Sequence, residues 1–262
     1  MTNPKRWLLM PIRISVRTVG IVVVMTVTAL VLLMVSGRGL PPPRFVLDRD
    51  QGSVDPLSYP LWRQASDWLA DRRYVVLSFD DGPWGQGVDE RILRILHRHG
   101  AHAIFFVICD HLDASRKHVL REIEQAGDVI GNHTVDHPFL RRLTPSALQH
   151  QIADCSARIS QITGHRPQFF RPPFGQSSAA IEKVVQSAGM AQVLWDANSQ
   201  DSWQREPGEI LHWSLTETKN RYVLLMHDSP TTAAALDRLL TALQRRGYRF
   251  VTPAPAATGD RH

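Results

Sequence analysis

Five short segments contain the residue types of a metal-assisted hydrolase, and each lies where an apolar strand is predicted to end. The segments are Ser78-Phe79-Asp80-Asp81-Gly82-Pro83, His133-Thr134-Val135-Asp136-His137, Phe170-Arg171-Pro172-Pro173-Phe174-Gly175, Asp201-Ser202-Trp203 and Leu225-Met226-His227. Together they supply adjacent carboxylates, two imidazoles four positions apart, one arginine, one further aspartate and one further histidine. Carboxylates and imidazoles bind divalent metals, and such metals activate water. The segments therefore predict a divalent-metal hydrolase site.

The first two segments are the candidate metal centre. The adjacent carboxylates of Asp80 and Asp81 repel each other unless a cation or an arginine lies nearby, although a plain capped turn would use the same residues. If the second segment forms a helical turn, the spacing of His133 and His137 places both imidazoles on one face. Chance spacing is the alternative, because the chain has 12 histidines. One carboxylate and two imidazoles leave open positions on a metal, as catalytic sites require.

The remaining polar side chains fit the proton transfers of a hydrolysis. The spare aspartate and His227 can act as base and acid. In a buried loop Arg171 would hold a carboxylate by bidentate pairing, whereas the alternative is a surface arginine before a proline kink. Asp136 is interpreted as a turn residue or a partner of the ligands. Histidines mixed with Lys and Arg are interpreted as solvated surface: His97, His99, His102, His111 and His118.

These segments need a scaffold, and the apolar pattern from Tyr74 onward predicts one. Strands are predicted over 74–79, 103–108, 128–130, 168–170, 192–195, 222–226 and 248–251. Helices are predicted over 88–99, 115–126, 145–162, 178–188, 207–219 and 232–245. Strands that alternate with helices indicate a parallel β/α architecture, and in a β/α barrel the functional groups lie on loops after the strands. No GxGxxG motif follows the first strand, so a dinucleotide-binding fold has no support.

The beginning of the chain predicts a membrane anchor. Residues 19–36 carry no charge and would form a helix roughly 27 Å long, close to the ~30 Å hydrocarbon core of a bilayer. Residues 1–18 are basic with no acidic residue, so the rest of the chain is expected outside the cytoplasm, periplasmic or at the cell surface. A cleaved signal peptide, and hence secretion, is the alternative. We expect a Pro-containing stem and linker over 37–73, the catalytic domain over 74–253 and a tail over 254–262.

Charge and cysteine content limit the partners. The formal net charge of +5 comes partly from the basic flank, and a basic exported domain favours an acidic cell-wall polymer. Nucleic acid is not expected, because no basic stripe has interleaved aromatic residues. Cys109 and Cys155 either pair or remain as two buried thiols, and their spacing is not that of a zinc site. The sequence does not indicate an oligomeric state.

In order along the chain, the five segments resemble the motifs of the polysaccharide deacetylase family, the NodB-homology or carbohydrate esterase family 4 domain. The resemblance spans roughly Tyr74 to Pro253. It implies a distorted (β/α)7 barrel and a metal-dependent enzyme that removes N-acetyl groups from an N-acetylglucosamine-containing polymer, releasing acetate. Peptidoglycan, chitin oligomers and an exopolysaccharide are all candidate substrates. An O-acetyl esterase and an inactive, membrane-anchored glycan-binding protein are the alternatives.

The resemblance also implies which residues carry the chemistry. Asp81, His133 and His137 would hold the metal. Asp80 would be the general base and His227 the general acid. Imidazole and carboxylate ligands suit Zn²⁺ best, with Co²⁺, Ni²⁺ and Mn²⁺ as alternatives.

Supporting roles follow from the same resemblance. Arg171 would tether the base, and Asp201 would orient the acid and raise its pKa. Trp203 and Leu225 would wall the acetyl pocket. The backbone N–H of Phe174 would join the metal in stabilising the oxyanion of the tetrahedral intermediate.

The sequence departs from the family pattern at two positions. Phe174 stands where the family often has Tyr, but the implied role belongs to the backbone. Ser202 lies between Asp201 and Trp203, whereas the family usually has Asp directly before Trp. Asp196 or Asn198 could then share the duty of Asp201.

Overall fold

The computed structural model describes residues 45–46 and 73–254. The basic flank over 1–18, the anchor over 19–36, nearly all of the stem and most of the tail lie outside the described residues. Among the described helices, none is long and apolar enough to cross a membrane. The anchor therefore stays a prediction.

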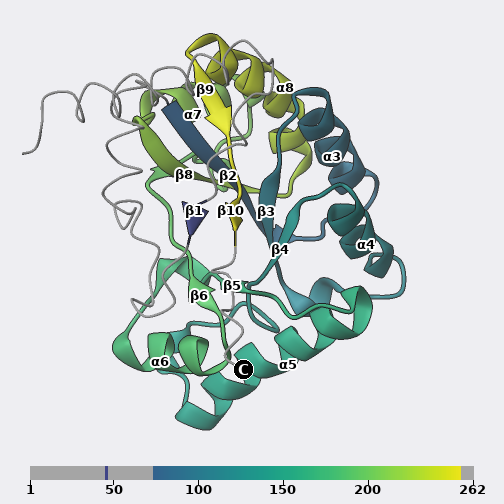
Figure 1. Cartoon of the computed structure of the whole chain (residues 1–262), viewed down its shortest axis with the longest axis vertical. Helices are drawn as coiled ribbons and strands as arrows, with labels where there is room; N and C mark the ends of the chain where they lie inside the picture. The colour runs from purple at the N-terminus through teal and green to yellow at the C-terminus, as the bar shows by residue number, and fades with distance from the viewer. Residues whose placement is uncertain (1–44, 47–72, 255–262) are drawn as a thin grey trace, which may run out of the picture. The chain divides into compact units, whose positions relative to one another are not determined.

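A sheet of eight parallel strands forms the centre of the fold (Figure 1). Its order is β6-β5-β4-β3-β2-β8-β7, and β9 pairs with β2. The strands are β2 (Arg73–Gly82), β3 (Ala103–Val107), β4 (Val129–Asn132), β5 (Phe169–Phe170), β6 (Ala191–Gln192), β7 (Ala197–Asn198), β8 (Arg221–His227) and β9 (Tyr248–Phe250). A separate parallel pair joins β1 (Phe45–Val46) to β10 (Pro253–Ala254).

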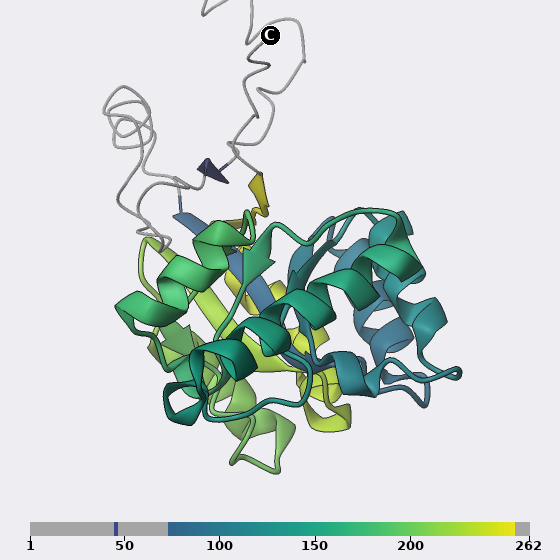
Figure 2. The same ribbon diagram turned by 90° about the horizontal axis from the view of Figure 1, so that it is seen from below.

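Helices follow most of the strands, as the sequence predicts. They are α3 (Val88–Arg98), α4 (Lys117–Gln125), α5 (Pro145–Thr163), α6 (Ala179–Ser187), α7 (Pro207–Thr216) and α8 (Pro230–Arg245). Short 3₁₀ turns add η1 (Cys109–His111), η2 (Leu140–Arg142) and η3 (Pro173–Gly175). The view from below shows the helices around the outside of the strands (Figure 2). The result is a parallel-strand α/β half-barrel, consistent with a distorted (β/α)7 barrel.

The two faces of the sheet belong to different apolar clusters. In β2, Val75, Leu77 and Phe79 join the larger apolar cluster that packs against the helices. Tyr74 and Val76 join a smaller inner cluster. Because side chains alternate along a strand, the next two even-numbered residues of β2 also face inward, and they are polar. The polar side chains at the end of β2 therefore point into the half-barrel.

Helix α5 shows how local signals set an element's bounds. Thr144 accepts a hydrogen bond from the backbone N–H of Ala147, and Pro145 occupies the first helical position. Both are typical of a helix start, because the first N–H groups have no partner inside the helix. Gly164, with φ of 83°, ends the helix in the left-handed region.

The strand predicted over 192–195 is wrong in its extent. The structure has β6 over Ala191–Gln192 and a separate strand, β7, that pairs with β8. The backbone carbonyls of Val193 and Leu194 instead accept hydrogen bonds from the guanidinium of Arg171, at 3.0 and 3.2 Å. A tertiary contact therefore takes the acceptors that a continuous strand would use.

Gly131 of β4 tests the packing of the inner face. A Cβ at this position would overlap the ring of Phe106, which is fully buried. We expect Gly131→Ala to lower the free energy of unfolding by about 1–3 kcal/mol, measured by urea denaturation, because overpacking displaces buried groups. Gly208→Ala in α7 is the control, since nothing lies within 4 Å of a Cβ there. Equal stability of the two variants would contradict this packing.

Candidate metal centre and active site

The predicted site residues converge at one end of the half-barrel. In the register of β2 and β8, Asp80 lies directly opposite His227. Asp81 is the next-to-last residue of β2, and His133 follows the last residue of β4. Arg171 follows the last residue of β5. This is the end at which parallel β/α folds carry their functional loops.

Asp81, His133 and His137 form the one group of potential metal ligands found among the described residues. Their ligand atoms all lie within 4.8 Å of one another. Oδ1 of Asp81 is 3.4 Å from Nε2 of His133 and 3.5 Å from Nε2 of His137. Two ligands about 2.1 Å from a tetrahedral ion are about 3.4 Å apart, so this donor set fits a divalent ion such as Zn²⁺.

The states of Asp81 and His133 also fit a bound cation. Oδ1 of Asp81 is buried and has no hydrogen-bond partner within the described residues. Nδ1 of His133 lies 2.7 Å from the carbonyl oxygen of Arg171. Because a carbonyl only accepts, Nδ1 carries the proton, and in the neutral ring Nε2 keeps its lone pair for a metal. Burial would raise the pKa of Asp81, but the imidazoles of His133, His227 and His137 lower it to about 2.

The helical turn considered for the second segment is wrong. Residues 133–137 form a loop in which Thr134 and His137 have φ of 75° and 58°. The N–H of His137 donates to Oγ1 of Thr134, and the N–H of Thr134 donates to Oδ1 of Asn132. Pro138 disfavours right-handed helical backbone at the residue before it. The loop nevertheless brings the two imidazole centroids within 4.9 Å.

Asp80 is held by a guanidinium that has no solvent exposure. Nη1 of Arg171 lies 2.7 Å from Oδ1 of Asp80 and 2.9 Å from Oγ of Ser78. The Arg171 Cζ lies 4.2 Å from the centroid of the Phe106 ring. The predicted bidentate pairing is wrong, because the other nitrogens of Arg171 donate to backbone carbonyls. Burial lowers the pKa of Arg171, and the charge of Asp80 opposes this effect.

His227 is paired with Asp201. Nδ1 of His227 lies 2.7 Å from Oδ1 of Asp201, and its backbone N–H donates to Oδ2. The hydroxyl of Thr232 also donates to Oδ2, at 2.6 Å. Burial alone would lower the pKa of His227, but its hydrogen bond and attraction to Asp201 raise it to about 9. Burial would likewise raise the pKa of Asp201, and its contacts with His227 lower it.

The extra residue Ser202 does not separate this pair. Oγ of Ser202 itself lies 3.2 Å from Nδ1 of His227. The two residues considered as substitutes for Asp201 are engaged elsewhere. Asp196 accepts from the backbone N–H of Val223, and Asn198 accepts from that of Gln200.

The predicted pocket residues differ in exposure. Leu225 is buried and lies two positions before His227 in β8, hence on the same face of the strand. Trp203 is 76% exposed. Phe174 is also exposed and has φ of 58°. Its ring centroid lies 4.6 Å from that of His137 and 4.3 Å from that of Phe139, on which it stacks.

Sequence reasoning missed several supporting residues. His111, interpreted as solvated surface, is half-buried and donates from Nδ1 to the carbonyl of Asp81 at 2.8 Å. Asp228 is fully buried behind Gly82, and burial together with Asp89 raises its pKa well above the usual range. The only sequence signal for these residues is their place shortly after a strand, four residues beyond β3 for His111 and one beyond β8 for Asp228.

The Asp201–His227 pair predicts a measurable titration. In Asp201→Asn we expect the pKa of His227 to fall from about 9 towards 6.5, because only the smaller effects of the Asp80 and Asp81 charges then oppose burial. Metal-free protein titrated by NMR at the imidazole protons would give both values. Asp196→Asn, a matched change that does not touch His227, should leave the pKa unchanged.

The same pair predicts a pH dependence of stability. Since the folded pKa of His227 is raised to about 9, its stabilising effect is complete below pH ~6.5 and is lost as the pH rises through about 9. The free energy of unfolding should fall over this range by up to about 3 kcal/mol in the parent protein. If the free energy of unfolding of Asp201→Asn fell by a similar amount over this pH range, the Asp201–His227 pair would not be its cause.

Comparisons with known proteins identify the family. Residues 70–193 match the family model for polysaccharide deacetylase. The peptidoglycan-N-acetylglucosamine deacetylase PgdA of Listeria monocytogenes is 34% identical over 179 residues, covering 68% of this chain but only 37% of that protein. The chitooligosaccharide deacetylase of Azorhizobium caulinodans is 30% identical over 201 residues, covering 75% of this chain and 94% of that protein.

Solved structures agree with these sequence matches. A family 4 carbohydrate esterase (CE4) pseudoenzyme from Bacillus anthracis superposes with a TM-score of 0.65 at 26% identity, covering 69% of this chain and 63% of the other. The fold alone therefore does not establish activity. The sequence match and the near-complete coverage of the Azorhizobium relative show that this protein belongs to the polysaccharide deacetylase family.

Proposed function

We propose that this protein is a divalent-metal-dependent N-deacetylase that releases acetate from an N-acetylglucosamine-containing polysaccharide or oligosaccharide. One observation carries the proposal: a three-residue metal-ligand set lies beside Asp80 and His227, which come from neighbouring strands. Relatives named as peptidoglycan and chitooligosaccharide deacetylases support the substrate class. The finer description of the fold, a distorted (β/α)7 barrel, belongs to the same proposal.

Asp81, His133 and His137 would hold the ion, with Zn²⁺ the preferred metal. When bound, a divalent ion supplies an activated water and polarises the acetyl carbonyl. The protein prepares the ligands beforehand, since Nδ1 of His133 is already bonded to a carbonyl oxygen. Such contacts orient a ligand and raise its affinity for the metal.

Asp80 would accept the proton of the attacking water. Its Oδ1 is bonded to Arg171, while Oδ2 lies 3.7 Å from Nε2 of His133 and faces the ligand set. One oxygen is thus fixed and the other is available for proton transfer. The backbone N–H of Phe174 would stabilise the oxyanion, and Leu225 with Trp203 would wall the acetyl group.

His227 would donate a proton to the departing amine. Its Nδ1 is occupied by Asp201, so Nε2 is the donor. A pKa raised to about 9 keeps the imidazole protonated at neutral pH, which suits a general acid. Two groups with opposite protonation tasks in one site are typical of acid–base catalysis.

The location of the domain outside the cytoplasm is part of the proposal. The disulfide between Cys109 and Cys155 supports it, because disulfides persist in oxidising compartments. Anchoring through residues 19–36 rests on the sequence alone.

Acetate release tests the proposed chemistry. We expect the purified protein to release acetate from N-acetylglucosamine oligomers or peptidoglycan, to lose this activity with a chelator and to regain it with Zn²⁺. Asp80→Asn should lower kcat at least about 100-fold while metal content is retained, because only the base is lost. His133→Ala should lose the metal itself. Unchanged turnover in Asp80→Asn, or full metal content in His133→Ala, would contradict the roles given to them.

An arginine at the edge of the site favours a polymer that carries carboxylates. The Cζ of Arg142 lies 4.8 Å from the centroid of the Phe139 ring. Phe139 stacks on Phe174, whose ring contacts that of His137. Within the described part of the chain Arg142 has no carboxylate partner, and it is exposed. The aromatic stack thus holds a free guanidinium near the metal centre.

Peptidoglycan strands carry carboxylates, and chitin oligomers do not. We expect Arg142→Gln to lower kcat/KM about tenfold on peptidoglycan strands, because one charge-assisted contact is lost. The kcat/KM on chitin oligomers should not change. Arg141→Gln is the matched control, since this exposed neighbour has no aromatic contact among the described residues. Equal effects of the two substitutions on both polymers would remove the case for an acidic substrate.

A further inference from the structure

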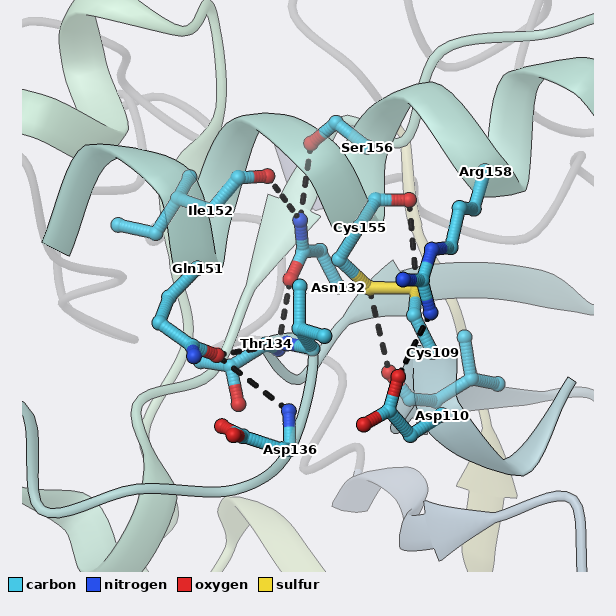
Figure 3. The surroundings of a disulfide bond; sticks show 12 residues. Cys109, Asp110, Asn132, Thr134, Asp136, Gln151, Ile152, Cys155, Ser156 and Arg158 are labelled. Carbon is cyan, nitrogen blue, oxygen red and sulfur yellow. Dashed lines mark hydrogen bonds and ion pairs between the residues drawn. A yellow bond between two sulfur atoms is a disulfide. The ribbon is translucent and has the colours of Figure 1, made fainter. Parts of the chain in front are cut away.

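The disulfide joins two segments that both hold the metal-ligand loop, residues 133–137 (Figure 3). Cys109 begins η1, which a single residue separates from the end of β3, and Cys155 lies in the middle of α5. Both are buried, their Cα atoms are 5.3 Å apart, and 46 positions separate them in the sequence. Neither cysteine touches a proposed ligand or catalytic group. The bond is therefore not part of the chemistry described above.

Turn η1 holds the ligand loop on one side through its backbone. The N–H of Cys109 donates to the carbonyl of Thr134 at 3.0 Å, and the N–H of Asp110 donates to that of Val135 at 2.9 Å. His111 in the same turn bonds the carbonyl of Asp81. One 3₁₀ turn therefore positions the backbone around two different ligand segments.

Helix α5 holds the loop on its other side (Figure 3). Oε1 of Gln151 accepts from the backbone N–H groups of Val135 and Asp136, at 3.0 and 3.3 Å. Nδ2 of Asn132, just before the loop, donates to the carbonyl of Ile152 and to Oγ of Ser156, both at 2.8 Å. The loop is thus bonded to η1 and to α5 at successive residues.

The loop needs this support, because Thr134 and His137 adopt positive φ without being glycine. Such residues keep a strained backbone only where their surroundings impose it. Apart from the disulfide, η1 and α5 are joined by the ion pair of Arg158 and Asp110, 2.7 Å long and about half exposed. Ion pairs this exposed contribute little, so the covalent bond is the main tie between the two supports.

We propose that the Cys109–Cys155 disulfide is a positioning element of the metal centre, and that the ligand loop reaches full metal affinity only after these cysteines are oxidised. In that step the two S–H bonds of the cysteines break and one S–S bond forms, while the S–S bond of a disulfide-bearing oxidant takes up the two electrons and two protons and breaks to give two thiols. The inference rests on the metal site of the proposed function. It predicts a protein that binds its metal weakly before export to an oxidising compartment.

Metal affinity is the readout that separates this role from general stability. We expect the double variant Cys109→Ala/Cys155→Ala to bind Zn²⁺ at least tenfold more weakly than the oxidised protein, measured by competition with a chromophoric chelator under conditions where both are folded. Alanine is preferable to reduction, because free thiols would themselves bind zinc. The Co²⁺-loaded variant should also show an altered visible absorption spectrum.

A matched variant controls for lost stability. Leu240→Ala removes a fully buried side chain of α8 and should also lower the melting temperature, while Zn²⁺ affinity stays that of the parent. Parent-like affinity in the cysteine variant, or an equal loss in both variants, would overturn the proposal. No Zn²⁺ binding by the oxidised parent would instead refute the metal centre of the proposed function.

A second pair of substitutions tests the same arrangement with the disulfide intact. Gln151→Leu removes the acceptor of two loop N–H groups and should weaken Zn²⁺ binding severalfold. Gln151→Glu keeps an acceptor of the same reach and should restore most of the affinity. Identical affinities for the two variants would show that α5 does not position the ligands, and would overturn the proposal even if the double cysteine variant failed to fold.

Discussion

Burial of the Arg171 guanidinium is the constraint on which the site depends. A charge with no solvent exposure is tolerated only when its hydrogen bonds are nearly all made, and here they go to a carboxylate, a hydroxyl and two backbone carbonyls. The same residue accepts from Nδ1 of His133 through its own carbonyl. One side chain and its backbone therefore link the end of β2, the ligand loop after β4 and the segment between β6 and β7.

The charges around the titratable groups of the site shift their pKa values in different directions. Asp81 and Asp201 have lowered pKa values because imidazoles lie beside them, whereas His227 has a raised pKa because Asp201 does. The pKa of Asp228 is raised instead, because its carboxyl is buried and lies beside that of Asp89. The proposed base, acid and metal-binding carboxylate can lie close together in different protonation states because each has a different partner.

The loops that carry these groups are strained and irregular, and their order comes from the scaffold around them. Positive φ at Asp81, Thr134 and His137 shows that backbone geometry at the ligands is imposed by neighbours. Those neighbours are η1 and α5, which a disulfide joins. The shared fold alone does not establish activity, because the Bacillus anthracis relative has this fold and is a pseudoenzyme.

The sequence by itself determined the alternation of strands and helices, the strand ends at which the five segments lie, and the membership of the family. Apolar periodicity shows which side of an element is buried from neighbouring positions alone, so these features can be predicted without knowledge of distant contacts. The tertiary structure alone decided the loop conformation at His133 and His137, the single contact between Arg171 and Asp80, and the disulfide. It also kept Asp201 on His227 despite the inserted Ser202, and it ended β6 early. Each of these depends on partners tens of positions away, as Arg171 and Asp80 are 91 apart, and only packing of the whole chain brings such groups together.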